Sequence, residues 1–433
     1  MNILSCSTTF RDKGFNTIRC FEKEMANFVH EDKHRCLLLS LILLAGSAAI
    51  VGTVDAQDGA GEAVEIENAD DLQELRDNPD GDYVLVDDID LSGVENFEPI
   101  GGVGSPSHVP EDSPLMEGIE VNDTPPFNGT FDGNGHEIAG LTIDCPNRTR
   151  VGLFGYIGSD AEIRNVGVVD ADLTGYLGVG GLVGEAGLGS TVSDSYVTGE
   201  LTAKEGGAGG LAGGNTGDIY RSYADVDVNV VDGRAAGGLV GNNGGEINRS
   251  YATGDVKAGA GAGGLVGNNI GTVNDSYATG DVTGGTPQQM GVGGLIGTNL
   301  GWVFRSYAVG EANSDGNEHP YVGGLVGRNE RNEGVTDSYW DIDSTGHTGS
   351  ENGTGLTTDE MTGENAAENM DGFEFTETWE TTESYPRLAW QEESENGGRD
   401  AEEEDLPGFN VFTALLSFGT GFGIVSWQQR SVI

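Results

Sequence analysis

The hydrophobic pattern of this chain repeats between Val151 and Trp340. Short β-prone runs alternate there with Gly, Asn and Asp, and no apolar period of 3.6 residues lasts long enough for a helix. A Gly-Gly-Leu-[Val/Ala/Ile]-Gly marker has its second glycine at Gly181, Gly210, Gly238, Gly264, Gly294 and Gly324, with a weaker relative at Gly152. The steps from Gly152 onward are 29, 29, 28, 26, 30 and 30 residues. These step lengths indicate that each step of the repeat forms one supersecondary unit.

Two further residue types recur in phase with the glycine marker. A Ser-Tyr marker places tyrosines at Tyr196, Tyr223, Tyr251, Tyr277, Tyr307 and Tyr339, and asparagines follow the second glycine by five residues at Asn215, Asn243, Asn269, Asn299 and Asn329. The pattern predicts an all-β fold, a parallel β-helix or β-solenoid of about 28-residue glycine-rich coils with small N- and C-terminal caps. We expect leucines and valines to fill its interior, and we expect asparagine amides and tyrosine rings to stack into ladders. Which face each column takes is left open.

Charged residues also follow the repeat. Four residues after each tyrosine comes a carboxylate, at Glu200, Asp227, Asp255, Asp281, Glu311 and Asp343. In stacked coils these would form an acidic column, either a solvated edge screened by salt or a site for bound cations. Two residues before each tyrosine lie Asp194, Arg221, Arg249, Asp275, Arg305 and Asp337, in which four of five neighbouring pairs have opposite sign. We expect that second column to favour correct register.

Composition limits the binding partners and the environment in which the protein can work. Acidic residues outnumber basic ones 71 to 21, which gives a net charge of −50 and excludes nucleic acid or an anionic membrane surface as a partner. At molar salt the Debye length falls to about 3 Å, so a halophilic environment would screen this charge. Three of four cysteines precede or adjoin the first apolar run, which leaves Cys145 as the only thiol of a processed chain. A disulfide framework is therefore not expected.

The two ends are predicted to be targeting segments. An apolar run at residues 37–52 follows His34 and Arg35 and suits a secretory signal cleaved near Ala56, with Met25 as an alternative start. At the other end Pro407, Gly408 and Phe409 precede an apolar stretch over residues 410–427. This tail resembles the Pro-Gly-Phe sorting signal of archaeal surface proteins, which implies an archaeal sorting enzyme that removes the helix and leaves a lipid anchor. The alternative is a short transmembrane anchor. Either reading places the protein at the cell surface, membrane-anchored through its C-terminus.

The repeat resembles the GLUG repeat family, named for its glycine-leucine-any-glycine core. The segments FNGTFDGNGHEIAGLTI and VGLFGYIG resemble the first coil of that family, and the stretch that begins SYWDIDSTGHTG resembles its C-terminal cap. The resemblance covers residues 83–390. It implies a secreted or surface protein of adhesin-like type. The expected organisation is signal peptide 1–56, N-terminal cap and first coil 57–150, repeat solenoid 151–340, C-terminal cap 341–390, acidic linker 391–406 and sorting signal or membrane helix 407–433.

Few residues carry candidate chemistry. Asp341 and Asp343 begin a D-x-D-x-T-G string like that of a calcium loop, although position twelve is Asn352 rather than a glutamate, so Ca²⁺ is the one cofactor considered. His30-Glu31-Asp32-Lys33-His34 matches a zinc-peptidase motif, but it lies upstream of the predicted cleavage site. Glycosylation sequons occur at Asn122, Asn128, Asn147, Asn248, Asn274 and Asn352.

Two function classes remain. The first is a non-catalytic surface protein, adhesive or part of a surface layer, that contacts surface glycans or proteins. The second is a polysaccharide lyase or hydrolase, because such enzymes also use parallel β-helices. Those enzymes need carboxylates or basic residues that converge in a groove. Here the acidic residues follow the repeat and the histidines beyond residue 56 are scattered, at His108, His136, His319 and His347, so the first class is predicted. The ligand, the oligomeric state and the true start are not set by the sequence.

Overall fold

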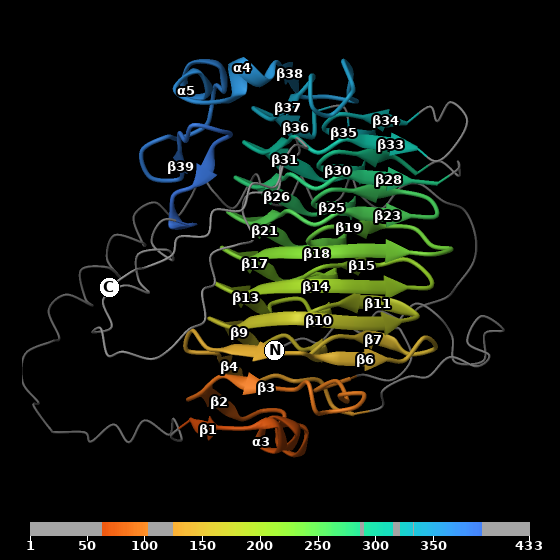
Figure 1. The fold of residues 1–433 in the computed structure, drawn as a ribbon, viewed down its shortest axis with the longest axis vertical. Helices are drawn as coiled ribbons and strands as arrows, with labels where there is room; N and C mark the ends of the chain where they lie inside the picture. Colours follow the sequence, from red (N-terminus) through yellow and green to blue (C-terminus); the bar gives the residue numbers. More distant parts are fainter. Residues whose placement is uncertain (1–62, 103–123, 286–289, 315–320, 332, 392–433) are drawn as a thin grey trace, which may run out of the picture. The chain divides into compact units, whose positions relative to one another are not determined.

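A computed structural model describes residues 63–102, 124–285, 290–314, 321–331 and 333–391 of the chain. These residues form a parallel β-solenoid of about seven turns, with strands of successive coils stacked one above another (Figure 1). The predicted fold class is confirmed. Within the described residues, the stacked strands make a ten-stranded sheet, a fourteen-stranded sheet and two seven-stranded sheets.

The coils at the Gly181 and Gly210 markers each contribute one strand to each of these four sheets. In the coil that starts at the Gly181 marker the strands are β11 (Leu177–Gly180), β12 (Val183–Ala186), β13 (Thr191–Ser193) and β14 (Tyr196–Ala203). Each strand pairs in parallel with its equivalent in the next coil: β15 (Ala208–Gly209), β16 (Ala212–Asn215), β17 (Asp218–Tyr220) and β18 (Tyr223–Val230). The register brings equivalent residues of the sequence repeat into contact.

The remaining strands extend these four sheets. The ten-stranded sheet also contains β1 (Val64–Ile66), β2 (Asp82–Leu85), β4 (Thr130–Asp132), β9 (Glu162–Arg164), β21 (Glu246–Asn248), β26 (Thr272–Asn274), β31 (Trp302–Phe304) and β36 (Val335–Thr336). One seven-stranded sheet adds β7 (Thr149–Val151), β19 (Ala236–Gly237), β24 (Ala262–Gly263), β29 (Val292–Gly293) and β34 (Val322–Gly323). The other adds β8 (Phe154–Ile157), β20 (Val240–Asn243), β25 (Val266–Asn269), β30 (Ile296–Asn299) and β35 (Val326–Asn329).

The fourteen-stranded sheet has its longest strands in three successive coils. It adds β3 (Ile89–Asp90), β5 (Glu137–Ala139), β6 (Thr142–Asp144), β10 (Gly167–Gly175), β22 (Tyr251–Ala252), β23 (Val256–Ala258), β27 (Tyr277–Ala278), β28 (Val282–Gly284), β32 (Tyr307–Ala308), β33 (Ala312–Ser314), β37 (Tyr339–Asp341) and β38 (Thr354–Leu356). The three coils after β18 each give this sheet two short strands where β14 and β18 give one: β22 with β23, β27 with β28, and β32 with β33. Parallel stacking begins at β1, well before the first glycine marker.

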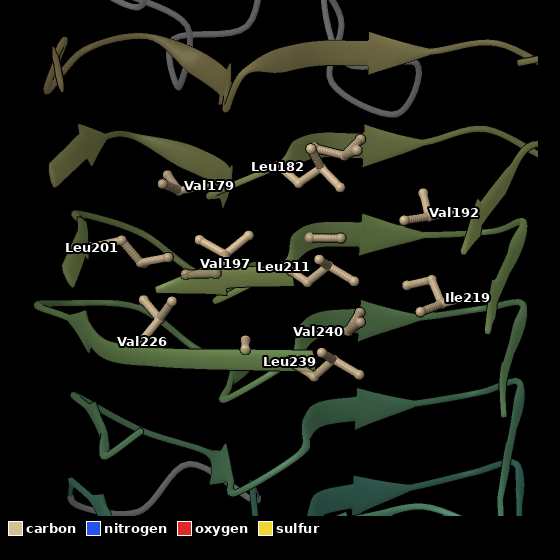
Figure 2. Close-up of a cluster of buried hydrophobic side chains, with 14 of the residues drawn as sticks. Val179, Leu182, Val192, Val197, Leu201, Leu211, Ile219, Val226, Leu239 and Val240 are labelled. Carbon is tan, nitrogen blue, oxygen red and sulfur yellow. The ribbon is translucent and has the colours of Figure 1, made fainter. Parts of the chain in front are cut away.

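Leucine and valine columns fill the interior, as predicted. Leu182, Leu211 and Leu239 are fully buried and follow one another up the stack, with Val192 and Ile219 facing them in Figure 2. Complete burial of one such side chain contributes about 1.5–3 kcal/mol. The marker glycines allow this packing: a Cβ added at Gly264 would lie 2.1 Å from the carbonyl oxygen of Gly294 and 2.9 Å from the Ala278 Cβ. A side chain at that position would force adjacent coils apart.

A left-handed residue makes the corner before the fourth strand of each coil. Its φ is 49° at Asp194, 46° at Arg221, 51° at Arg249, 47° at Asp275, 44° at Arg305 and 47° at Asp337. Positive φ is uncommon for residues other than glycine. The column that the sequence predicts to control register therefore also carries the recurring bend of the backbone.

Both ends of the stack are covered. At the N-terminal end, helix α3 (Ala69–Glu74) and the 3₁₀ turn η1 (Leu75–Asp77) bury Leu72 and Leu75 against the solenoid core. Asn68 caps α3 by accepting from the backbone N–H groups of Asp70 and Asp71.

The segment after β37 forms what we call the C-terminal cap (residues 354–391). It contains β38, α4 (Thr358–Met361), α5 (Asn365–Asn369) and an antiparallel pair, β39 (Trp379–Glu380) and β40 (Arg387–Leu388). Figure 1 shows α4 and α5 at the end of the stack and β39 beside it. A second apolar core joins Trp379, Phe373 and Met361 to the outer tyrosines of the solenoid. The cap therefore covers part of one side as well as one end.

Candidate functional site

The asparagine column forms the predicted amide ladder. The side-chain N–H of Asn215 donates to Asn243 Oδ1 at 2.9 Å, and the chain continues from Asn243 to Asn269 at 2.9 Å and from Asn269 to Asn299 at 2.8 Å. These four residues are at most 2% exposed. Asn299 then donates to Asn329 at 2.9 Å, and Asn329 donates to Asn352 at 2.6 Å. Asn352 lies outside the glycine marker, so its sequon gave no sign of this role.

The tyrosine rings stack as predicted. Ring centroids are 4.8 Å apart from Tyr196 through Tyr223 and Tyr251 to Tyr277, and 5.0 Å apart between Tyr277 and Tyr307, with planes within 3°. Burial raises the pKa of Tyr223 to about 12 and holds the pKa values of Tyr251, Tyr277 and Tyr307 well above their usual range. The cap covers the C-terminal part of this ladder, where the Tyr307 hydroxyl donates to the Pro386 carbonyl oxygen at 2.5 Å.

A serine ladder accompanies the tyrosines and was not recognised as a structural column from the sequence. Each serine hydroxyl accepts from the backbone N–H of the residue below it, for example Ser250 Oγ from Ser222 at 3.2 Å and Ser276 Oγ from Ser250 at 3.2 Å. The same hydroxyl donates to the carbonyl two residues earlier, as Ser276 does to Asn274 at 2.8 Å. The signal was present in the sequence, because a serine precedes every repeat tyrosine.

The acidic column is stacked on the outside of the fourteen-stranded sheet. Asp227 accepts from the Asp255 backbone N–H at 3.1 Å, Asp255 from Asp281 at 2.9 Å, and Asp281 from Glu311 at 2.8 Å. Each carboxylate thus serves as acceptor for the next coil. Burial, followed by the charges of Asp281 and Asp227, raises the pKa of Asp255 above its usual value.

The column differs from the sequence prediction at both ends. Strand register pairs Glu200 with Asp172, so it starts one coil earlier. The Ser-Tyr marker could not locate Asp172, because Gly167 occupies the position that pairs with Tyr196. At the other end Asp343 accepts instead from the Thr358 N–H of the cap at 3.1 Å.

The alternating-charge column forms only part of the predicted pairs. Arg221 binds Asp194, with Nε to Oδ1 at 2.6 Å, and Arg305 binds both oxygens of Asp275 at 2.8 and 3.0 Å. Among the residues that the structure describes, Arg249 forms no salt bridge. Its guanidinium donates to the Tyr220 hydroxyl at 3.2 Å and to Thr378 Oγ1 of the cap at 3.1 Å.

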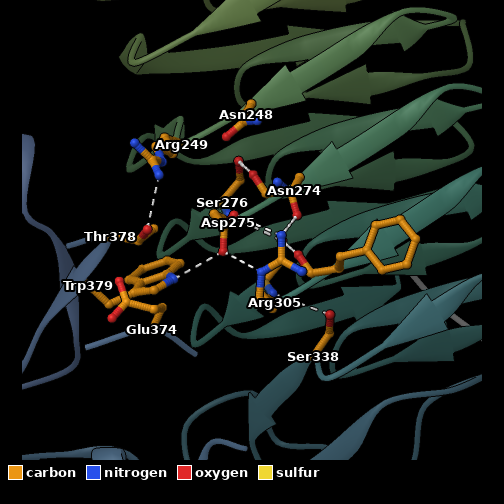
Figure 3. A network of polar contacts seen from close by, with 12 residues as sticks. Asn248, Arg249, Asn274, Asp275, Ser276, Arg305, Ser338, Glu374, Thr378 and Trp379 are labelled. Atoms are coloured by element: carbon orange, nitrogen blue, oxygen red, sulfur yellow. Dashed lines mark hydrogen bonds and ion pairs between the residues drawn. The ribbon is translucent and has the colours of Figure 1, made fainter. Parts of the chain in front are cut away.

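A polar crevice lies where this column meets the cap (Figure 3). Its volume is about 450 Å³, and it is lined by Tyr220, Asn248, Arg249, Asn274, Asp275, Arg305, Glu374 and Thr378. Asp275 is 6% exposed and also accepts a long bond from the Trp379 indole N–H at 3.4 Å. The cap is held at this level by Thr378 and by Trp390, whose indole N–H donates to the Arg249 carbonyl at 2.9 Å. We call this site the cap crevice.

Asp341 and Asp343, the calcium candidates, both bond to the cap. Asp341 is fully buried; its Oδ1 accepts from the backbone N–H groups of Asp343 and Ser344, and its Oδ2 accepts from the Thr358 and Tyr385 hydroxyls at 2.6 and 2.5 Å. Within the described residues, no group of three or more His, Cys, Asp or Glu is placed to hold a metal ion. The geometry gives Asp341 a role in joining the last coil to the cap, and calcium binding stays a prediction.

The sequon asparagines occupy different environments. Asn147 is exposed in a turn, Asn128 donates to Asp80 at 3.0 Å, and Asn248 and Asn274 line the cap crevice. Their modification stays a prediction. Asn122, the cleavage site at Ala56, the sorting motif at Pro407, Gly408 and Phe409, and the apolar stretch 410–427 lie outside the described residues. In the described part of the chain, no helix has the length and apolar character needed to cross a membrane.

Comparison with known proteins identifies the repeat and places the fold. The GLUG motif matches residues 175–202 and 232–257. Halomucin of Haloquadratum walsbyi is 37% identical over 157 residues, which is 36% of this chain but only 2% of halomucin. The crystal structure of a putative immunoglobulin A1 protease from Bacteroides ovatus aligns over 76% of this chain and 93% of its own, with a TM-score of 0.50 and 21% identity.

A second solved structure, an IgA1 protease, aligns over 64% of this chain and 21% of its own, with a TM-score of 0.41 and 16% identity. The likeness to the Bacteroides structure concerns the fold alone. Together with the stacked coils, the motif matches show that the chain carries GLUG motifs within a parallel β-solenoid.

Proposed function

We propose that this protein is a salt-adapted repeat protein of the cell surface that acts by binding and not by catalysis. The acidic column is the observation that carries the proposal. Its exposed carboxylates bond to backbone N–H groups of the next coil, so they are part of the stack and cannot converge freely on a substrate. Similarity to halomucin from Haloquadratum walsbyi supports the surface location.

The physical consequence of the acidic column is a surface that needs salt. Unit charges about 5 Å apart repel by about 1 kcal/mol in water, and each column member has such neighbours. Screening at molar salt removes most of this cost while the carboxylates keep a hydrated outer layer. A long hydrated flank is suited to contact with surface glycans, neighbouring cells or the protein layer of the same cell.

Anchoring is proposed to follow the resemblance of the tail to archaeal sorting signals. The partners would be a membrane-bound sorting enzyme and a lipid. We expect the mature protein to start near Gln57 and to lack the apolar C-terminal stretch. Mass spectrometry of the membrane fraction tests this expectation; recovery of peptides spanning Val411 to Trp427 would favour a transmembrane anchor instead.

Surface location is tested separately on intact cells. Protease treatment without lysis is expected to release peptides from residues 124–285, whereas an abundant cytoplasmic protein serves as the control for lysis. If these peptides appear only after the cells are broken, the proposed surface function is wrong.

A further inference from the structure

We propose that the cap crevice binds an anionic saccharide, with Arg249 as the group that recognises its charge. This inference deepens the proposed surface function, because it names a ligand class for a protein that would meet glycans outside the cell. It is carried by three observations about the crevice: a guanidinium without a carboxylate partner, a buried acceptor without a donor, and a polar lining large enough for a sugar.

Arg249 has no partner of opposite charge within the alternating-charge column. The column pairs Asp194 with Arg221 and Asp275 with Arg305, and Arg249 lies between these two pairs. Asp275 accepts from Arg305 on both oxygens and from the Trp379 indole N–H, and among the described residues it forms no ion pair with Arg249. The bonds of Arg249 to Tyr220 and Thr378 use neutral acceptors and leave N–H groups of its five-donor guanidinium for a ligand. Arg148, Arg234 and Arg331 also form no salt bridge among the described residues, but of these four arginines only Arg249 lines the cap crevice.

The crevice also has an acceptor without a donor. Asn248 Oδ1 is buried and finds no hydrogen-bond partner among the residues that the structure describes, while the Asn248 amide N–H donates to Glu246 at 3.1 Å. Buried acceptors are nearly always paired, because an unpaired one has lost its water without replacement. A hydroxyl from a ligand would supply the donor.

The two groups together select the ligand class. A simple inorganic anion satisfies Arg249 but offers no hydroxyl to Asn248, and a neutral sugar offers hydroxyls but leaves the guanidinium without its charged partner. A sugar acid or a sulfated sugar offers both. The volume of about 450 Å³ and the amide and hydroxyl lining from Asn274, Tyr220 and Thr378 suit such a molecule. Glu374 in the same wall disfavours ligands with several negative charges.

The negative field of the protein does not prevent this binding under the conditions that its charge implies. At about 1 M salt the Debye length is about 3 Å, so repulsion from distant carboxylates is screened, whereas contacts at hydrogen-bond distance persist. The affinity for an anionic sugar is therefore expected to hold or to rise as salt increases. A long-range electrostatic attraction would show the opposite dependence.

Binding can be measured by isothermal titration calorimetry on the full chain, produced in a host that does not attach glycans, at about 1 M potassium chloride. The probes are glucuronate, glucose 6-sulfate, glucose and inorganic sulfate. Glucuronate, glucose 6-sulfate or both are expected to bind, and the comparison separates carboxylated from sulfated ligands. Glucose and sulfate alone are expected to bind at least about tenfold more weakly, because each lacks one of the two contacts.

Variants assign the contacts. Arg249→Gln is expected to lower affinity for the anionic sugar at least about tenfold, and Asn248→Ala to lower it while leaving weak sulfate binding unchanged. Arg164→Gln is the matched control, since Arg164 belongs to β9, three strands from β21 in the ten-stranded sheet, pairs with Asp132 and Glu162, and does not line the crevice. A melting curve shows whether Arg249→Gln has loosened the cap; if it has, Asn248→Ala and Arg249→Lys carry the test.

The inference is overturned if neither anionic sugar binds the wild-type chain, or if Arg249→Gln, Arg249→Lys and Asn248→Ala all bind as the wild type does. Equal binding of glucuronate and inorganic sulfate would also overturn it, since it would show a site for any anion. These outcomes differ from failure of the proposed surface function, which is judged on intact cells and needs no ligand.

Discussion

Among single residues, Asn269 shows most clearly how the ladder stabilises the stack. It is fully buried, accepts from Asn243, and donates to both Asn299 and the Trp302 carbonyl oxygen. Replacing it by leucine leaves the Asn243 amide N–H and the Asn299 carbonyl oxygen with fewer partners in a dry interior. We expect Asn269→Leu to lower the free energy of unfolding by about 1–3 kcal/mol, measured by thermal or denaturant unfolding.

Asn329→Leu is the matched control for that change, because Asn329 belongs to the same ladder but is only half-buried near its end. A clearly smaller loss is expected there. Equal and negligible losses for both variants would mean that the amide ladder follows from the stacking and does not stabilise it.

The tyrosine ladder predicts a characteristic response to alkali. Burial raises the folded-state pKa values above the ordinary value of 10.0, to about 12 for Tyr223 and well above 10.0 for Tyr277. The unfolded chain therefore loses these protons at a lower pH than the folded protein does. The contribution to stability is complete below pH 10 and is lost as pH rises from 10 through about 12.

We therefore expect unfolding above about pH 10, with tyrosine absorbance at 295 nm and loss of circular dichroism changing together. Tyr223→Phe keeps the ring but removes one such hydroxyl, so it should move the transition to higher pH. Tyrosine ionisation that is complete near pH 10 in a still-folded protein would contradict the burial of this ladder.

How far residues could be predicted depended on whether they lie within the repeating marker. Asn243 and Tyr251 recur at fixed offsets from a glycine, and stacking in register makes such residues neighbours. Asp172 and Asn352 extend the same columns, but they lie in coils whose sequence has lost the marker. Arg249 and Thr378 meet across 129 positions of the chain. That contact depends on the path of the cap, which no periodic pattern encodes.

At the scale of a secondary-structure element, the cap strand β39 is packed against the solenoid through Trp379. Trp379 is fully buried, with ring centroids 4.7 Å from Phe373, 5.7 Å from Tyr307 and 6.1 Å from Tyr277. Trp379→Ala is expected to cost about 3–5 kcal/mol at the interface between cap and solenoid. Because the coils also pack on one another, we expect the cap to open before the stack melts.

Hydrogen exchange can resolve this loss by position. Amides of residues 354–391 should lose protection in Trp379→Ala, while those of β12 and β16 keep theirs. The partly exposed Trp302 gives a control: Trp302→Ala should leave cap protection unchanged, since Trp302 is 36% exposed and belongs to the solenoid wall. Uniform loss of protection in Trp379→Ala would indicate that cap and coils unfold as one unit.

The acidic column predicts a salt response at the scale of a sheet. Asp255→Asn combined with Asp281→Asn keeps acceptor oxygens for the backbone N–H bonds and removes two adjacent charges. At low salt we expect this variant to unfold at a higher temperature than the wild type and to need less salt. Asp160→Asn with Glu383→Gln changes net charge equally at two exposed, separated positions and should have a smaller effect.

The sign of the pH effect is consistent with this expectation. Since the folded-state pKa of Asp255 is raised, the folded protein holds that proton more readily than the unfolded chain. Stability from this group is complete below the unfolded value of 3.8 and is lost as pH rises through the folded value. Sodium and potassium should act alike and smoothly, while a saturating gain at micromolar calcium that Asp341→Asn abolishes would establish the calcium site.

For the whole molecule, the spacing of the glycine markers was sufficient to predict a stacked parallel fold. Leu182, Leu211 and Leu239 lie where a repeat of one coil per marker requires them. The coils that precede the markers were harder to predict, because β2 and β4 are separated by a long insertion and share no motif with β9. Function was harder to predict from the sequence than the fold. The residues that a column needs for stacking are the same whether or not a ligand binds to it.

The cap contacts only part of the stack, so whole coils can be inserted or deleted more readily outside that part than within it. The cap touches the solenoid from Asp341 in the last coil down to Arg249, so the number of coils between those points is fixed by the length of the cap. Among the described residues, coils on the N-terminal side of Arg249 pair their strands with adjacent coils. A duplicated or lost coil there would leave every cap contact intact. Related chains should therefore differ in length mainly before this point, by whole coils inserted or deleted on the N-terminal side of the cap contacts.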